Sequence, residues 1–180
     1  AQKGSLKLTG PYEDVHELLE ARVVQEAGME AGGMMHAGRS RNDQVATDIR
    51  MAVREEILNV AEALLALVEE LLTLSSKHLG TVMVLYTHGL PAQTSSFGHY
   101  LLSWADALTR DFERLIDCYR RVNLSPLGAS AIAGSSFRLP RRLTARLLGF
   151  DGLVENSVDA ITSRDFALET ASTLAILHSN

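Results

Sequence analysis

The chain has 180 residues, 46% of them hydrophobic and 22% charged, and a formal net charge of -5. These values are typical of a globular protein with its own core, and the negative charge argues against a general nucleic-acid surface. The single cysteine, Cys118, excludes an intrachain disulfide and favours a reducing compartment. No apolar run reaches the roughly 18 residues of a membrane span, and the first residues lack the apolar centre of a signal peptide. We therefore expect a cytoplasmic protein.

The first residues, 1–12, are expected to form a linker or an incomplete lead-in that ends at Gly10-Pro11. Apolar residues then recur at helical spacing from Glu13, and Gly28 supplies a stop signal, which predicts a first helix over this stretch. His16 lies in its first turn beside two acidic residues, and we expect it to be a surface histidine.

A polar segment with good helix-entry signals follows at residues 32–49. Ser40 can cap the helix, and Asp43 stands three residues later in a capping-box position. A helix start attracts anions, and Arg39 and Arg41 flank this one, so a carboxylate or phosphate site is one interpretation. Local chemistry alone favours the other interpretation, a solvated basic loop before a capped helix.

The longest periodic segment of the chain runs from Asn42 to Gly80 without a proline. About 36 helical residues would make a rod of roughly 54 Å, longer than a small domain is wide. Its second half, AEALLALVEELLTL, is apolar on more than one face. Such a helix must be surrounded by other helices, which predicts a bundle completed by other subunits.

The helical period breaks at residues 81–97, where a β-branched and aromatic run leads to Pro91 and the cap candidates Ser95-Ser96. A second long helix is predicted from about Gly98 to Val122 and includes Cys118, an expected inert, partly buried residue.

A connection rich in Gly, Ser and Ala follows at 123–138, and Pro140 begins a short predicted helix that ends at Gly149. The arginines of that helix are expected on a solvated face. A last helix is predicted from between Val158 and Ser163 to the end. The pattern indicates an all-α fold with almost no strand.

Three polar segments, at 36–44, 86–93 and 156–165, interrupt the helical pattern where helices begin or loops end. Segments of this kind can converge on one site in a bundle. The six histidines are scattered without the spacing of a helical metal site, and no phosphate-cradling G-x-x-x-x-G-K-[ST] motif is present. A histidine with hydroxyl, amide and guanidinium neighbours remains, and that set suits proton transfer on an anionic substrate.

These segments carry a family resemblance. The chain resembles the argininosuccinate lyases of the fumarase/aspartase superfamily in HAGRSRNDQVATDIR at 36–50, YTHGLPAQ at 86–93 and NSVDAITSRDF at 156–166. EDVHELLEARVVQEAG at 13–28 and PLGASAIAG at 126–134 add to the likeness, which covers nearly the whole chain in the family's order. The run GRSRNDQ is specific to this branch.

The resemblance implies a reversible β-elimination of argininosuccinate to arginine and fumarate, with no metal or organic cofactor. It implies an all-α fold, a long-helix bundle of the fumarase/aspartase type, completed by the central helical bundle of a homotetramer whose sites are shared between subunits. Residues 1–41 would be the end of an amino-terminal domain, and residues 42–180 part of the central helical-bundle domain.

The resemblance also implies roles for single residues. His88 matches the histidine of proton transfer, as acid more than as base, and Asn42 and Thr87 match residues that hydrogen-bond the substrate. The remaining matching positions that line the site are Ser40, Arg41 and Gln93. Asp159 and Arg164 match a region near the site, where a structural ion pair is an equally good interpretation.

The chain departs from the family pattern at Ala37, Val84-Leu85 and Thr94. The family's Gly-Ser-Ser…Met-Pro loop, which supplies the serine base, is expected after Asn180. The chain is therefore expected to be a fragment that is inactive by itself. Two alternatives remain open: a structural protein like δ-crystallin, and a sister lyase of another succinyl-amine such as adenylosuccinate.

Overall fold

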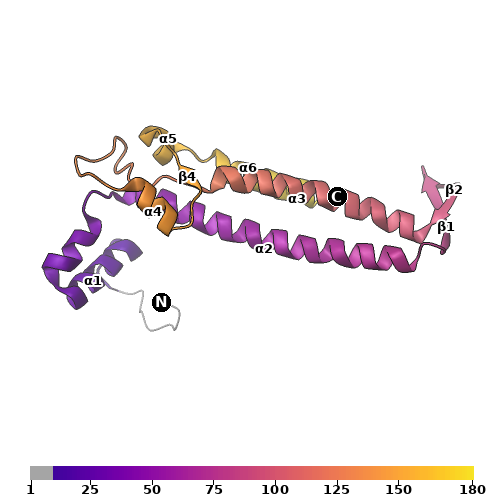
Figure 1. Ribbon diagram of the computed structural model, residues 1–180, viewed down its shortest axis with the longest axis horizontal. Coiled ribbons are helices and arrows are strands. Elements are labelled where there is room, and N and C mark those ends of the chain that lie inside the picture. The colour runs from indigo at the N-terminus through magenta and orange to yellow at the C-terminus, as the bar shows by residue number, and fades with distance from the viewer. Residues whose placement is uncertain (1–9) are drawn as a thin grey trace. The chain divides into compact units, whose positions relative to one another are not determined.

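The computed structural model describes residues 10–180, so most of the expected linker at 1–12 lies outside the described residues. Figure 1 shows that long helices dominate the chain. In chain order the elements are α1 (Val15–Gly32), the 3-10 helix η1 (Gly33–His36), α2 (Arg41–Lys77), β1 (Val82–Thr87), β2 (Leu90–Ser96), α3 (Phe97–Val122), β3 (Leu124–Ser125), α4 (Arg141–Leu147), β4 (Gly152–Leu153), α5 (Ser157–Thr162) and α6 (Asp165–Leu177). The two long helices predicted from the sequence are confirmed to within about three residues at their ends. The described residues contain no helix both long and apolar enough to cross a membrane.

The chain divides into two compact units, and helix α2 contributes to both. One unit comprises residues 49–124 and 163–180, in which α3 and α6 pack beside the main length of α2 (Figure 1). Its buried residues form one cluster from the three helices: Ile57, Ala61, Leu64, Leu115, Cys118, Val122 and Phe166. Burial of this apolar stripe stabilises the three helices against one another.

Cys118 is fully buried in this cluster, where burial raises the pKa of its thiol. The thiol lies 3.1 Å from the hydroxyl oxygen of Thr170. The sequence predicted a partly buried residue at this position, and the side chain is buried more deeply than that.

The segment expected only to break the helical period forms an antiparallel hairpin of β1 and β2. Its β-branched and aromatic residues suit a pleated strand, and a register shift lies between Leu85 and Tyr86. The two-residue turn is His88-Gly89, with φ angles of 52° and 75°. Two positive φ angles are those of a type I′ turn, the usual tight hairpin connection. Ser96 then caps α3 by accepting the N–H of His99 at 3.2 Å, as predicted.

The other unit comprises residues 1–48 and 125–162, of which the structure describes those from 10 onward. Within it, the predicted stop at Gly28 is a kink rather than an end, because Gly28 has φ 81° and ψ 162° and the chain resumes a helical path to Gly32. The last predicted helix forms as two helices, α5 in this unit and α6 in the first, with a break at Ser163 and Arg164.

The expectation of a wholly solvated arginine face on α4 is wrong for Arg141. Its guanidinium donates to the carbonyl oxygens of Leu127 at 3.1 Å and of Val154 at 3.0 Å. Arg141 therefore fastens α4 to the glycine-rich connection and to the chain after β4. Arg142 and Arg146 are exposed, as predicted.

Candidate functional site

The first polar segment forms the amino-terminal end of α2. Ser40 donates its N–H to the Asp43 carboxylate at 3.0 Å, and the Ser40 hydroxyl accepts the N–H of Asn42 at 3.3 Å. These two bonds satisfy backbone groups that a helix start leaves without partners. Ser40 and Asp43 take their predicted capping positions, although the Ser40 hydroxyl accepts the N–H of Asn42 rather than that of Asp43.

Asp43 also holds the glycine-rich connection. Its second carboxylate oxygen accepts the N–H groups of Gly128 at 2.9 Å and Ser130 at 2.8 Å. The Asp43 side chain is fully buried. One carboxylate thus ties the start of α2 to the segment 126–134, a role that spacing along the sequence does not reveal.

The candidate substrate residue Asn42 faces the same segment. Its side-chain nitrogen donates to the carbonyl oxygen of Ala131 at 2.9 Å, and the residue itself is exposed. An exposed carboxamide held at one end can present its remaining groups to a ligand.

The two arginines of this segment have different environments. Arg41 forms an ion pair with Asp14, the N-cap residue of α1, at 2.9 Å. Accepting the N–H of Glu17 lowers the pKa of Asp14, and the charge of Arg41 lowers it further. Arg39 has two buried guanidinium nitrogens that lack a hydrogen-bond partner within residues 10–180. The unsatisfied donors near the helix start therefore belong to Arg39.

His16 is more enclosed than the surface histidine expected from the sequence. One ring nitrogen lies 2.8 Å from the side-chain nitrogen of Gln44, and the other lies 3.7 Å from the Asp48 carboxylate. Burial raises the pKa of Asp48, although the neighbouring His16 and Arg39 act against that rise. These contacts dock α1 on the first turns of α2.

The second polar segment lies on the β1–β2 hairpin. A pocket of ≈ 450 Å³ is lined by both Thr87 and Gln93, and Tyr100 of α3 forms part of its wall. His88 occupies the tip of the turn, where it is exposed and has no side-chain partner among the described residues. A non-glycine residue with positive φ is uncommon and often occurs at functional sites.

The third polar segment spans α5 and the start of α6. Asn156 caps α5 by accepting the N–H groups of Val158 at 2.9 Å and Asp159 at 3.1 Å. Asp159 is exposed in the first turn of α5, and Arg164 precedes α6 as its N-cap residue.

The predicted site residues thus fall into two groups. Ser40, Arg41 and Asn42 lie together at the start of α2, whereas Thr87, His88 and Gln93 share the hairpin. Along the sequence most of the 37 residues of α2 lie between the two groups, which belong to different compact units.

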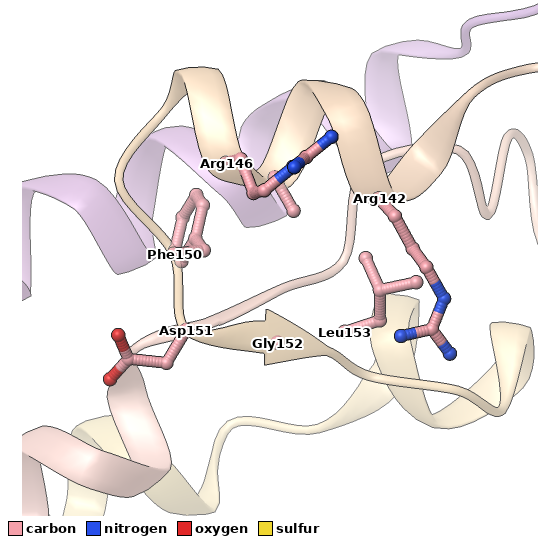
Figure 2. A pocket seen from close by; sticks show the side chains of 7 residues that line it. Arg142, Arg146, Phe150, Asp151, Gly152 and Leu153 are labelled. Carbon is pink, nitrogen blue, oxygen red and sulfur yellow. The ribbon is translucent and has the colours of Figure 1, made fainter.

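A further pocket of ≈ 400 Å³ lies between α4 and β4 and contains none of the predicted site residues. Figure 2 shows Arg142 and Arg146 extending from α4, with Phe150 and Leu153 on the facing chain. Arg142 lies 3.4 Å from Glu155, and both side chains are exposed.

Long helices with a short hairpin form a mainly helical fold, which the chain shares with solved lyase structures. The solved structure of EDDS lyase in complex with formate matches 89% of this chain with a TM-score of 0.85 and 40% identity, and a variant with bound fumarate matches equally well. A family model described as Lyase matches residues 5–180, and the chain belongs to this lyase family.

Curated relatives with the name argininosuccinate lyase are similar over almost the whole chain. The protein of Nitrosopumilus maritimus is 51% identical over 93% of this chain, and that of Methanococcoides burtonii is 50% identical over 99%. The chain spans 35% and 36% of the length of these two relatives.

Proposed function

We propose that the protein is an argininosuccinate lyase, which splits argininosuccinate reversibly into arginine and fumarate by β-elimination. The observation that carries this proposal is the 50% identity, over 99% of the chain, to an enzyme of that name. Identity to EDDS lyase is lower, at 40%, so the argininosuccinate substrate is favoured over EDDS. The similarity also favours an enzyme over a purely structural protein.

The reaction demands an acid, a base and donors for a carboxylate that gains charge. A base removes the proton from the carbon beside a succinyl carboxylate, and the electron pair spreads onto that carboxylate. The pair then forms the double bond of fumarate while the carbon–nitrogen bond breaks, and an acid protonates the departing guanidinium nitrogen. Donors placed where the negative charge develops lower the barrier.

The residues of the two polar groups suit the roles of acid and of donors. His88 is the proposed acid, because its exposed ring at the hairpin tip is free to meet a substrate. Asn42 and Thr87 are the proposed donors to the substrate. The remaining contacts are assigned to Ser40, Arg41 and Gln93.

We place these two groups at one site through association of several copies. Along the chain most of the 37 residues of α2 lie between the two groups, and the family resemblance implies sites that are shared between subunits. Exposed leucines on α2, among them Leu58, Leu65, Leu67 and Leu72, support such packing. The proposal is a cytoplasmic homotetramer, in which residues 1–41 end an amino-terminal domain and residues 42–180 belong to the central helical domain.

The test is fumarate release by the full-length protein, followed by ultraviolet absorbance. Argininosuccinate is compared with adenylosuccinate, aspartate and EDDS, and it should be the preferred substrate. His88→Asn should reduce kcat by about 10²-fold or more, the usual loss for a proton-transfer group. His99→Asn, on an exposed histidine in the first turn of α3, is the matched control and should retain activity. A folded wild-type protein that releases no fumarate would contradict the proposal.

A further inference from the structure

Asp43 is the most connected polar side chain of the first motif. Its carboxyl group is 0% exposed and accepts three backbone N–H groups, from Ser40, Gly128 and Ser130, at 3.0, 2.9 and 2.8 Å. Hydrogen bonds to a carboxylate are about twice as strong as those between neutral groups. The start of α2 and the segment 126–134 are therefore held by one side chain.

The segment 126–134 has a backbone that depends on this hold. Gly128 has φ 92°, which suits glycine, but Ser130 has φ 55°, a left-handed conformation that costs a residue with a Cβ atom energy. The N–H of Ser130 can donate to Asp43 only while Ser130 keeps this strained conformation. The carboxylate thus fixes the path of the chain just before Ala131.

The carbonyl group of Ala131 then orients Asn42. The side-chain nitrogen of Asn42 donates one N–H to this carbonyl oxygen at 2.9 Å. A carboxamide nitrogen carries two N–H groups, so the second remains available to a ligand. The contact decides which end of the amide is the donor, and a substrate carboxylate requires a donor.

We propose that Asp43 is a positioning residue, which fixes the segment 126–134 so that Ala131 holds the Asn42 carboxamide ready to donate to a substrate carboxylate. This inference rests on the proposed lyase function and adds to it a residue that touches no substrate. Asp43→Asn should lower kcat/KM about 10²-fold, because a small misplacement of a binding group costs that much.

The test is a double-mutant cycle in the full-length protein with fumarate release from argininosuccinate as the readout. The variants are Asn42→Ala, Asp43→Asn and the double variant. If Asp43 acts through Asn42, the double variant has the kcat/KM of Asn42→Ala within about twofold. Amides of 126–134 should exchange hydrogen faster in Asp43→Asn and at the wild-type rate in Asn42→Ala.

Thr47→Val is the matched control. The buried Thr47 hydroxyl donates to the backbone carbonyl of Asp43 at 2.7 Å and leaves the carboxylate untouched. This variant should lower the thermal midpoint while kcat/KM stays within about twofold of wild type. Should Asp43→Asn fail to fold, the cycle is repeated in a Ser130→Gly background, because glycine adopts the left-handed conformation without strain.

The possible results separate the two hypotheses. Additive losses in the cycle, or an equal loss of kcat/KM in Thr47→Val, would overturn the positioning role while the lyase function stands. A wild-type protein that releases no fumarate would instead overturn the proposed function, and the inference with it. Non-additive losses of kcat/KM together with faster exchange at 126–134 support both the positioning role and the lyase function.

Discussion

Arg50, the last residue of the first motif, should stabilise the carboxyl end of α3. The side chain is 4% exposed, and its guanidinium donates to the carbonyl oxygens of Arg121 at 2.9 Å and Val122 at 3.2 Å. It also lies 4.1 Å from the centre of the Phe166 ring. A cation at a helix carboxyl end satisfies free carbonyl groups and interacts favourably with the helix dipole.

Replacement by methionine keeps an unbranched apolar chain and removes the charge and the donors. Hydrogen bonds to a charged group contribute about 1.5–3 kcal/mol each, and removal of the desolvated charge offsets part of the loss of two such bonds. We expect Arg50→Met to weaken the local structure by about 2–4 kcal/mol. Because every 1.4 kcal/mol is tenfold, amides in the last turns of α3 should exchange hydrogen about 30- to 700-fold faster.

The assay is hydrogen exchange with mass spectrometry on peptides from the end of α3. Arg110→Met is the control, because Arg110 is exposed on the same helix and donates to the carbonyl oxygen of Asp106 at 3.0 Å. Arg110→Met should change the local stability at the end of α3 by no more than about 0.5 kcal/mol, or roughly twofold in the hydrogen-exchange rate. Equal exchange rates in the two variants would refute the capping role of Arg50.

Three further predictions follow from the contacts. Leu115→Ala, at a fully buried position in the three-helix cluster, should cost about 2–5 kcal/mol, measured as a lower urea midpoint; an unchanged midpoint would contradict the packing. The lowered pKa of Asp14 means that its cap and its pair with Arg41 stabilise α1 above about pH 4, and that this contribution is lost as the pH falls through the lowered value. The protection of α1 amides, corrected for the intrinsic exchange rate at each pH, should therefore fall in acid, and Asp14→Asn should remove this pH dependence. Co-expressed Asn42→Ala and His88→Asn subunits should release fumarate well above the residual rate of either variant alone, because a mixed assembly contains sites with both residues intact; no recovery in a confirmed mixed oligomer would speak against shared sites.

Local rules predicted the helices and their caps well. The apolar period and the absence of proline identify α2, while Ser40 and Ser96 act as the cap residues that their side chains favour. The hairpin was harder to predict, because its short β-branched run was interrupted by polar turn residues. Pairing of β1 with β2 depends on cross-strand contacts, which a single stretch of sequence does not contain.

The sequence likewise predicts only part of the candidate site. The motifs predicted Asn42 and His88 as functional residues from the family resemblance, but the role of Asp43 as an anchor remained hidden. Its contacts with Gly128 and Ser130 join residues 85 and 87 positions apart, and such long-range pairs follow from the tertiary fold. The contacts of Arg141 are equally hidden in the sequence, since its carbonyl partners lie outside its own helix.

The measurement that tests the account most directly is the release of fumarate from argininosuccinate by the purified full-length protein. We expect turnover of argininosuccinate in preference to adenylosuccinate, aspartate and EDDS, and a loss of about 10²-fold in His88→Asn beside an active His99→Asn control. A folded oligomer that releases no fumarate, or that prefers another of these substrates, would contradict the proposed function.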